Sequence, residues 1–333
     1  MFPEKVDVLI AGAGPTGLAA GFVLAESGAD VLVVDCRERI GHPVRCAGVV
    51  EPPFFQVMGV QPREGWIRWR LSTGALLLDR ETMEYELAKI LQSRGAVVRS
   101  ATAVSGVGPF DGVGRQVSLL DADGGHRVRA GCVIAADGVS SAVARFAGMD
   151  TRLPLERCGT ALAHSVVDAM LSDPHTNHTE PLPAPYPHPP FVFWVTPTGS
   201  DSANVGLALP GRDGYRARRI LEDRMARTKA YTGGRVVRTI TGVLPDAVPL
   251  ERPLDDGLLV AGAAARLIDP LKGAGIFYGA ASGKVAAITL AGLDGAAATT
   301  ERLGGYVDGI FPIIGRIRAR YEHMKDMWSG MPY

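Results

Sequence analysis

The chain has 333 residues, which is enough for one large domain or two coupled domains with a substantial core. Its 35 lysines and arginines balance 35 aspartates and glutamates, so charge gives no basis for binding nucleic acid or an acidic membrane. A hydrophobic fraction of 47% excludes a disordered chain. Four widely spaced cysteines, without a CxxC pair, predict a reduced, cytoplasmic location.

The first 35 residues carry the clearest secondary-structure signal. Residues 6–10 form a short apolar run that predicts a strand, and a glycine cluster follows it. Helix-forming residues then continue from 18 to 26 and stop before Gly28, and Val31–Val34 is a second apolar run closed by Asp35. Strand, glycine turn, helix and strand together predict a βαβ unit, and therefore a sheet that begins parallel.

Apolar spacing and proline content predict the later elements. Met83, Leu87 and Leu91 predict a helix over residues 83–93. Residues 172–190 hold seven prolines and three histidines, which predicts a loop, and the histidines lack regular ligand spacing, so we predict no metal site. A hairpin is predicted around residues 199–202. The other predictions are strands at 97–107, 117–120, 132–136, 191–195, 205–209 and 258–261, and helices at 215–229 and 276–290.

The last segment has apolar residues at alternating steps of four and three, which places one apolar stripe along a helix. We predict that this helix docks on the body of the protein. The alternative is a helix that lies on a membrane surface, which would make the protein a peripheral membrane contact. The stripe consists of Ile310, Ile314, Ile317, Tyr321, Met324 and Trp328.

The first glycine cluster has GxGxxG spacing, follows a predicted strand and opens a predicted helix. Asp35 lies 23 residues after Gly12, which is the context that a dinucleotide-binding fingerprint requires. Backbone N–H groups and the helix dipole would bind the pyrophosphate, and Asp35 would accept hydrogen bonds from the adenosine ribose hydroxyls. The pattern does not choose between NAD and FAD. The residues predicted to bind at this loop are Gly12, Ala13, Gly14, Pro15, Thr16 and Gly17.

Two later motifs indicate FAD. Residues 135–141 contain an Asp-Gly pair and are followed by Arg145, and residues 262–265 precede a proline–glycine turn at 270–275. With the first cluster, they resemble the FAD-binding pattern of glutathione-reductase-like flavoproteins with the p-hydroxybenzoate-hydroxylase type fold. The resemblance implies that Asp137 and Gly138 support the pyrophosphate and ribityl region. It also implies that the later motif faces the ribityl chain and flavin pyrimidine, through Gly262, Ala263, Pro270, Gly273 and Gly275.

Narrower matches point to one family. Residues 41–49, with Arg45 and Cys46, and residues 191–197 and 204–207, with Trp194, resemble motifs of the geranylgeranyl reductase family. That resemblance implies FAD-dependent reduction of carbon–carbon double bonds in a prenyl chain, with hydride from reduced flavin N5. Cys46 would lie beside the isoalloxazine as a candidate proton donor, or is a packing residue. Arg45 would contact phosphate or the flavin edge, and Trp194 is a wall of the apolar pocket or part of the core.

Three positions depart from that family pattern. Ala263 stands where the family's Gly-Asp-Ala-Ala motif has the aspartate that holds the ribityl chain. Losing one such hydrogen bond costs about 1–3 kcal/mol, so we expect weaker FAD retention. Val192 and Thr196 stand where the family usually has tyrosine and phenylalanine, so the substrate-facing wall is expected to differ.

The predicted fold is α/β, with a discontinuous three-layer FAD-binding domain, a substrate domain built on an antiparallel sheet, and C-terminal helices. The FAD-binding domain is assigned residues 1–45, 80–150 and 251–300, and the substrate domain 46–79 and 151–250. Residues 301–333 form the C-terminal helical tail. The alternative functions are a group A flavin monooxygenase, which shares these FAD motifs, and a non-catalytic FAD-binding relative.

The predicted partners follow from the same analysis. The chain has no second strand–GxGxxG–helix unit for a resident NAD(P)H domain. We therefore expect an external electron donor, which is NADPH, a deazaflavin or a ferredoxin. The expected substrate is a prenyl-chain lipid, and no nucleic acid is expected to bind.

Overall fold

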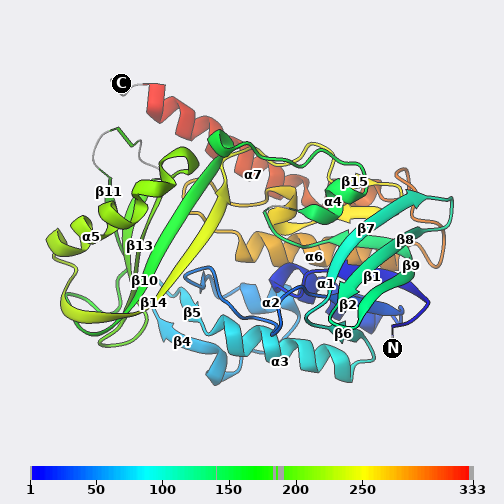
Figure 1. Cartoon of the computed structure of the whole chain (residues 1–333), viewed down its shortest axis with the longest axis horizontal. Coiled ribbons are helices and arrows are strands. Elements are labelled where there is room, and N and C mark those ends of the chain that lie inside the picture. Colours follow the sequence, from blue (N-terminus) through cyan, green and yellow to red (C-terminus); the bar gives the residue numbers. More distant parts are fainter. Residues whose placement is uncertain (1, 140, 183–184, 187–190, 330–333) are drawn as a thin grey trace.

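The computed structural model describes all residues except 1, 140, 183–184, 187–190 and 330–333. Figure 1 shows two bodies side by side along the long axis of the molecule. An eight-stranded sheet covered by helices forms one body, and a five-stranded antiparallel sheet forms the other. The C-terminal helix runs along the edge of both.

The eight-stranded sheet has a parallel centre. Strand β1 pairs in parallel with β2 and β9, so the prediction of a parallel start is confirmed. The order of the main path is β15-β16-β9-β1-β2-β6, and β8 pairs with both β7 and β9. The bounds are β1 Lys5–Ala11, β2 Val31–Val34, β6 Val97–Arg99, β7 Ala103–Phe110, β8 Arg115–Asp121, β9 Gly124–Ala135, β15 Leu254–Asp255 and β16 Leu258–Val260.

Helices α1 (Pro15–Glu26) and α6 (Ile276–Ala291) approach each other closely because glycines face Thr16. A Cβ on Gly283 would lie 2.1 Å from the backbone oxygen of Thr16, and one on Gly279 would lie 2.6 Å from its Oγ1. The N-termini of the two helices are therefore fixed next to each other. The shorter α4 (Ala142–Phe146) and the longer α3 (Arg80–Ser93) also pack around this sheet.

Residues 49–78 form a small third sheet, ordered β3-β5-β4, with a short helix α2 (Phe54–Met58). The strands are β3 Val49–Val50, β4 Ile67–Arg70 and β5 Leu76–Leu78, and a 3₁₀ turn, η1 (Glu64–Trp66), precedes β4. Phe54 and Trp66 are fully buried in the same core as the parallel sheet. Residues 46–79, assigned from sequence to the substrate domain, thus pack their apolar side chains on the FAD-binding side. The domain boundaries stay a prediction.

The five-stranded antiparallel sheet has the order β11-β12-β13-β10-β14. The predicted hairpin around residues 199–202 is confirmed, since β12 and β13 pair across it. The loop prediction for residues 172–190 is wrong at His178–Pro181, which forms the edge strand β11, a position where prolines are tolerated. The other bounds are β10 Cys158–Leu171, β12 Val192–Pro197, β13 Ala203–Pro210 and β14 Tyr231–Pro245, with η2 Leu155–Arg157 before the sheet and η3 Gly211–Arg216 after β13.

The two faces of the antiparallel sheet have different surroundings. Helix α5 (Ala217–Arg227) buries Leu221 in a core with Phe193, Leu162 and Leu207, so these side chains mark the outer face. Residues directly opposite one another on neighbouring strands share a face, and side chains alternate between faces. The other face, called here the inner face, contains the cross-strand row formed by Trp194, Gly206, Ala163 and Ile240.

The predicted C-terminal helix is confirmed as α7 (Gly304–Ser329), and its apolar stripe docks on the body. Tyr306 is fully buried, and its hydroxyl donates a hydrogen bond to the backbone oxygen of Val260 in β16. Ile310, Ile314, Ile317, Tyr321 and Met324 are buried, and the side chain of Trp328 lies outside the described residues.

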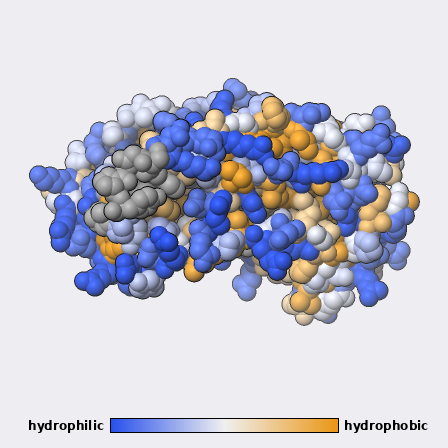
Figure 2. Space-filling model, turned by 90° about the horizontal axis from the view of Figure 1, so that it is seen from above, coloured by the Kyte–Doolittle hydropathy of each residue, from blue (hydrophilic) through white to orange (hydrophobic). Residues whose placement is uncertain are grey.

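The surface beside α7 is mixed in polarity. Figure 2 shows hydrophilic residues over most of this side, interrupted by smaller apolar patches. Among the described side chains of α7, the large apolar one that stays exposed is Phe311, at 66%. Within the described part of the chain, every helix is too short or too polar to cross a bilayer.

Candidate functional site

The glycine motif between β1 and α1 contains three glycines. Two of them are closely packed against the backbone, and the third faces open space. A Cβ on Gly12 would lie 2.3 Å from the backbone oxygen of Ala136, and one on Gly17 would lie 1.8 Å from the oxygen of Gly12. Gly12 also has φ +108°, which side chains disfavour. Nothing lies within 4 Å of a Cβ on Gly14. The loop is therefore closely packed at Gly12 and Gly17, and it leaves room for a phosphate over Gly14, next to a helix N-terminus.

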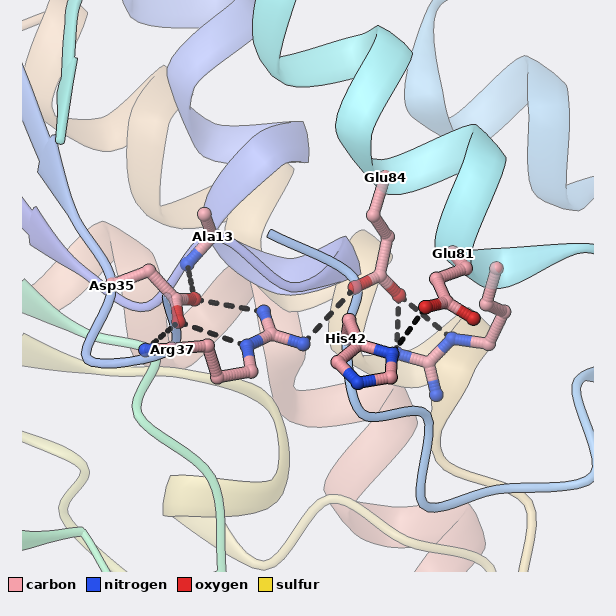
Figure 3. A network of polar contacts seen from close by, with 7 residues as sticks. Ala13, Asp35, Arg37, His42, Glu81 and Glu84 are labelled. Carbon is pink, nitrogen blue, oxygen red and sulfur yellow. Dashed lines mark hydrogen bonds and ion pairs between the residues drawn. The ribbon is translucent and has the colours of Figure 1, made fainter. Parts of the chain in front are cut away.

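Asp35 follows β2 as predicted, but its carboxylate is buried and bound to the chain itself (Figure 3). Its Oδ2 accepts hydrogen bonds from Ala13 N at 2.7 Å and from Arg37 Nη2 at 2.8 Å. Its Oδ1 accepts from Arg37 N and Nε at 2.9 and 2.8 Å. A carboxylate has about four acceptor positions, so a ribose hydroxyl would have to exchange with one of these bonds.

Burial opposes ionisation of Asp35. The hydrogen bonds and positive charge of Arg37, with the N–H of Ala13, outweigh that effect and lower the pKa of the carboxyl below its ordinary value. Asp35 is thus an anion at neutral pH. It fixes the glycine loop to the end of β2.

Arg37 extends the network to helix α3, as Figure 3 shows. Its Nη1 lies 3.5 Å from Oε2 of Glu84, whose side chain is fully buried, and Oε1 of Glu84 accepts from Arg80 Nε at 2.7 Å. Burial disfavours both guanidinium cations, but Asp35 and Glu84 raise the pKa of Arg37, and Glu84 raises that of Arg80. Sequence analysis missed this network. The predicted helix began at residue 83, whereas α3 begins at Arg80, so the acid–base pair at positions 80 and 84, four apart, was a signal only for a helix that starts earlier.

Asp137 and Gly138 lie at the end of β9, next to the glycine loop. Asp137 Oδ2 accepts from Val143 N at 3.0 Å, whereas its Oδ1 is buried without a partner among the described residues. Burial raises the pKa of this carboxyl. Gly138 has φ +89° and open space at its Cβ position. An orphaned buried oxygen beside an open backbone fits a ligand that supplies a hydroxyl group. Ser140, in the same motif, lies outside the described residues.

The third motif begins in the 3₁₀ turn η4 (Gly262–Ala265) after β16. Gly262 has φ +63°, and its N–H donates to Ser282 Oγ at 2.9 Å. Ala263 is partly exposed. Pro270 is buried, and Gly273 has φ +62° in the turn before α6, where Gly275 is the N-cap. Gly262 lies beside the glycine loop, because a Cβ there would be 2.3 Å from Thr16 Oγ1.

We expect Ala263→Asp to tighten FAD binding by about 1–3 kcal/mol, roughly ten- to hundredfold. The position is partly exposed, so the new carboxylate is not buried without a partner, and it can accept from ribityl hydroxyls. Titrating FAD into both apoproteins measures the effect, with Ala263→Asn as the neutral control. Weaker binding by the aspartate variant would contradict the assignment of this position to the ribityl chain.

The loop that carries Arg45 and Cys46 lies between the two bodies. Both side chains are exposed, and Gly48 N lies 3.4 Å from Cys46 Sγ. The backbone oxygen of Arg45 lies 3.3 Å from the Cβ position of Gly242 in β14. Gly242 pairs with Ala161 and therefore shares the inner face. The roles of Arg45 and Cys46 stay predictions.

Two cross-strand rows of the inner face are apolar and contain several small residues, whereas the next row is polar and consists of Thr196, Asn204, Ser165 and Arg238. A Cβ on Gly206 would lie 2.5 Å from Cζ2 of Trp194 and 2.6 Å from Cβ of Ala163, so the indole ring covers this glycine. Trp194 Nε1 donates to the buried Asn204 Oδ1 at 2.8 Å, which fixes the ring. The neighbouring row contains Ala208, Ala161 and Gly242. Trp194 therefore lies fixed on the inner face, and its role as a pocket wall stays a prediction.

The predicted residues of the three glycine motifs are brought together by the parallel strands. Ala11 of β1 pairs with Ala135 of β9, and Val260 of β16 pairs with the same Ala135. The segments after these strands therefore meet at one edge of the sheet, where open α/β sheets bind ligands. The open space over Gly14 and the orphaned oxygen of Asp137 fit a dinucleotide there.

Comparison with known proteins agrees with this geometry. Residues 5–58 match the family model described as FAD binding domain. The chain is 32% identical over 310 residues to digeranylgeranylglycerophospholipid reductase 2 of Methanopyrus kandleri. The alignment covers 85% of this chain and 76% of that protein. It is also 32% identical over 310 residues to the digeranylgeranylglycerophospholipid reductase of Methanosphaerula palustris, covering 85% and 75%.

Solved structures share the fold. A geranylgeranyl bacteriochlorophyll reductase-like protein from Thermoplasma acidophilum has a TM-score of 0.88 at 24% identity, covering 96% of this chain and 88% of that one. A p-nitrophenol 4-monooxygenase from Pseudomonas putida has a TM-score of 0.74 at 19% identity, covering 97% and 90%. At these identities the likeness concerns the fold, which reductases and monooxygenases have in common.

Proposed function

The chain belongs to the geranylgeranyl reductase family of FAD-binding oxidoreductases, which includes the digeranylgeranylglycerophospholipid reductases, and from this we propose its reaction. It is an FAD-dependent reductase that saturates carbon–carbon double bonds of a prenyl chain of the geranylgeranyl type. The observation that carries this proposal is the pair of apolar rows on the inner face, Trp194/Gly206/Ala163/Ile240 and Ala208/Ala161/Gly242, which the loop of Arg45 and Cys46 meets at Gly242. It suits an extended hydrocarbon better than a polar substrate.

The inner face supplies the wall of the prenyl site. Ala161, Ala163, Gly206 and Ala208 have short or absent side chains, so an extended chain can lie close to the sheet. Trp194 adds a flat apolar surface held by Asn204. Such a wall excludes water and holds the alkene in one orientation, which an unactivated double bond needs.

When bound, reduced FAD supplies a hydride from N5 to one alkene carbon. The chain binds the cofactor through the glycine loop, through Asp137 and Gly138, and through the turn before α6. A proton must then reach the other alkene carbon. Cys46 is the candidate donor, because its thiol lies on the loop that meets the inner face at Gly242.

The reaction needs electrons from outside the chain. We propose NADPH, a deazaflavin or a ferredoxin as the donor, and a prenyl-chain lipid as the substrate. We propose that the enzyme is cytoplasmic, as its cysteine content predicts, and reaches a lipid substrate through peripheral contact with a membrane.

Mass spectrometry of lipids after coexpression with a prenyl-lipid pathway tests the reaction. Saturation adds two hydrogens per double bond, and the expected result is a series of such additions. The matched control is the Gly14→Leu variant, which should lose the cofactor. Added oxygen would identify a monooxygenase instead, and an unchanged lipid profile from a colourless protein would indicate a non-catalytic relative.

Trp194→Ala is expected to raise the KM for prenyl substrate roughly ten- to hundredfold, because burial of hydrocarbon against the indole contributes about 1.5–3 kcal/mol. FAD affinity should stay within about twofold, since Trp194 lies on the sheet and not on an FAD motif. Steady-state kinetics and flavin titration measure the two effects. Trp194→Phe keeps an aromatic ring, so its KM should lie between that of Trp194→Ala and that of the wild type. If FAD affinity fell by as much as the KM rose, the assignment of Trp194 to the substrate wall would be contradicted.

A further inference from the structure

The turn before α6 is closed by its own first residue, Asp269. Oδ1 of Asp269 accepts from the backbone N–H groups of Leu271 and Lys272, at 2.9 and 3.3 Å. Asp269 N donates to Ala274 O, and Gly273 N donates to Asp269 O, both at 2.9 Å. The conformation of the turn therefore depends on the Asp269 carboxylate, which is only 2% exposed.

The other carboxylate oxygen belongs to a different part of the fold. Oδ2 of Asp269 forms an ion pair with Nη1 of Arg320 in α7. Arg320 is 31% exposed, and its neighbours Ile317 and Tyr321 are buried, so the helix holds the guanidinium against the turn. The Tyr321 hydroxyl also donates to Pro245 O, at the end of β14. A buried carboxylate needs such a partner, because an unpaired charge there is strongly unfavourable.

We propose that Arg320 is a positioning residue for the flavin, acting through Asp269. It neutralises the carboxylate that closes the turn, so the turn can face the flavin pyrimidine without a net negative charge behind it. This rests on the proposed FAD site. The pyrimidine end gains negative charge when the flavin is reduced, so the pairing stabilises bound reduced flavin more than bound oxidised flavin.

The test compares the affinities of both oxidation states in charge-altered variants. In Arg320→Met, reduced FAD should bind about tenfold more weakly relative to oxidised FAD than in the wild type. That ratio corresponds to a midpoint potential about 30 mV more negative for the two-electron couple. Asp269→Asn keeps an oxygen for the two N–H groups and leaves Arg320 positive, so its potential should shift in the opposite direction. The double variant Asp269→Asn/Arg320→Met should return to within about twofold of the wild-type ratio.

Arg318→Met is the matched control, because Arg318 is exposed on the same helix and should change neither affinity. The proposal would be overturned if Arg320→Met weakened the binding of reduced and oxidised FAD equally. It would also be overturned if the double variant behaved like Arg320→Met. Either result would mean that the ion pair only stabilises the fold. If Arg320→Met does not fold, the sign of the Asp269→Asn shift decides alone. Failure of the wild type to bind FAD would instead refute the cofactor site, since these titrations need no prenyl substrate.

Discussion

Gly14→Leu is expected to abolish FAD binding while the protein stays folded. Gly14 has φ −83°, which leucine tolerates, and its Cβ position faces open space. The added side chain would occupy the room in which the pyrophosphate meets the backbone, so we expect at least about a thousandfold weaker binding, or about 4 kcal/mol. Flavin fluorescence titration of the apoprotein measures this loss.

Gly12→Ala provides the contrast for this experiment. Its Cβ would lie 2.3 Å from Ala136 O at φ +108°, so the fold itself should lose more than about 1 kcal/mol. Gly14→Leu should cost the apoprotein no more than about 1 kcal/mol, the usual range at an N-cap. Stoichiometric FAD in purified Gly14→Leu would refute the assignment of the glycine loop.

Glu84→Gln is expected to lower the free energy of unfolding by about 3–5 kcal/mol, the usual effect of removing one partner from a buried ion pair. Glu84 is fully buried between Arg37 and Arg80, and the amide would leave the Arg80 cation, which is only 15% exposed, without its counter-charge. Urea unfolding followed by circular dichroism measures the change.

Glu86→Gln is the matched control, two residues further along the same helix. Its carboxylate is 36% exposed and accepts from Arg63 and from Trp66 Nε1, and the amide oxygen can keep one of these bonds. We expect a change of less than about 1 kcal/mol. Equal effects of the two substitutions would show that burial does not set the strength of the Glu84 network.

Local sequence patterns predicted the parts of the fold that depend on residues close to one another in the sequence. The run at Val31–Val34 and the stripe on α7 each lie within one element, the glycine spacing covers one short turn and the start of α1, and the structure confirms all three. The small sheet of residues 49–78 was missed because its strands are two to four residues long, which is too short for a periodic signal.

The site was predicted less completely than the fold. The sequence places Asp35 at the end of a strand, and this is correct. It cannot show that Arg37 and Ala13 fill the acceptor positions of Asp35, since those contacts depend on side-chain direction. Arg320 was missed for another reason. It meets Asp269 across 51 positions of sequence, and no local pattern links the two.

The order of the strands has a consequence for synthesis on the ribosome. The glycine loop emerges early from the ribosome. However, β16 must still pair with β9, and α7 must dock before Asp269 can form its ion pair with Arg320. A nascent chain therefore has the first flavin motif for most of its translation without a site that can enclose the cofactor. Chains that stop before Arg320 lack this closure. Fragments that end before β16 lack the third flavin motif, so we expect them to hold flavin poorly and to be the forms that proteases remove first.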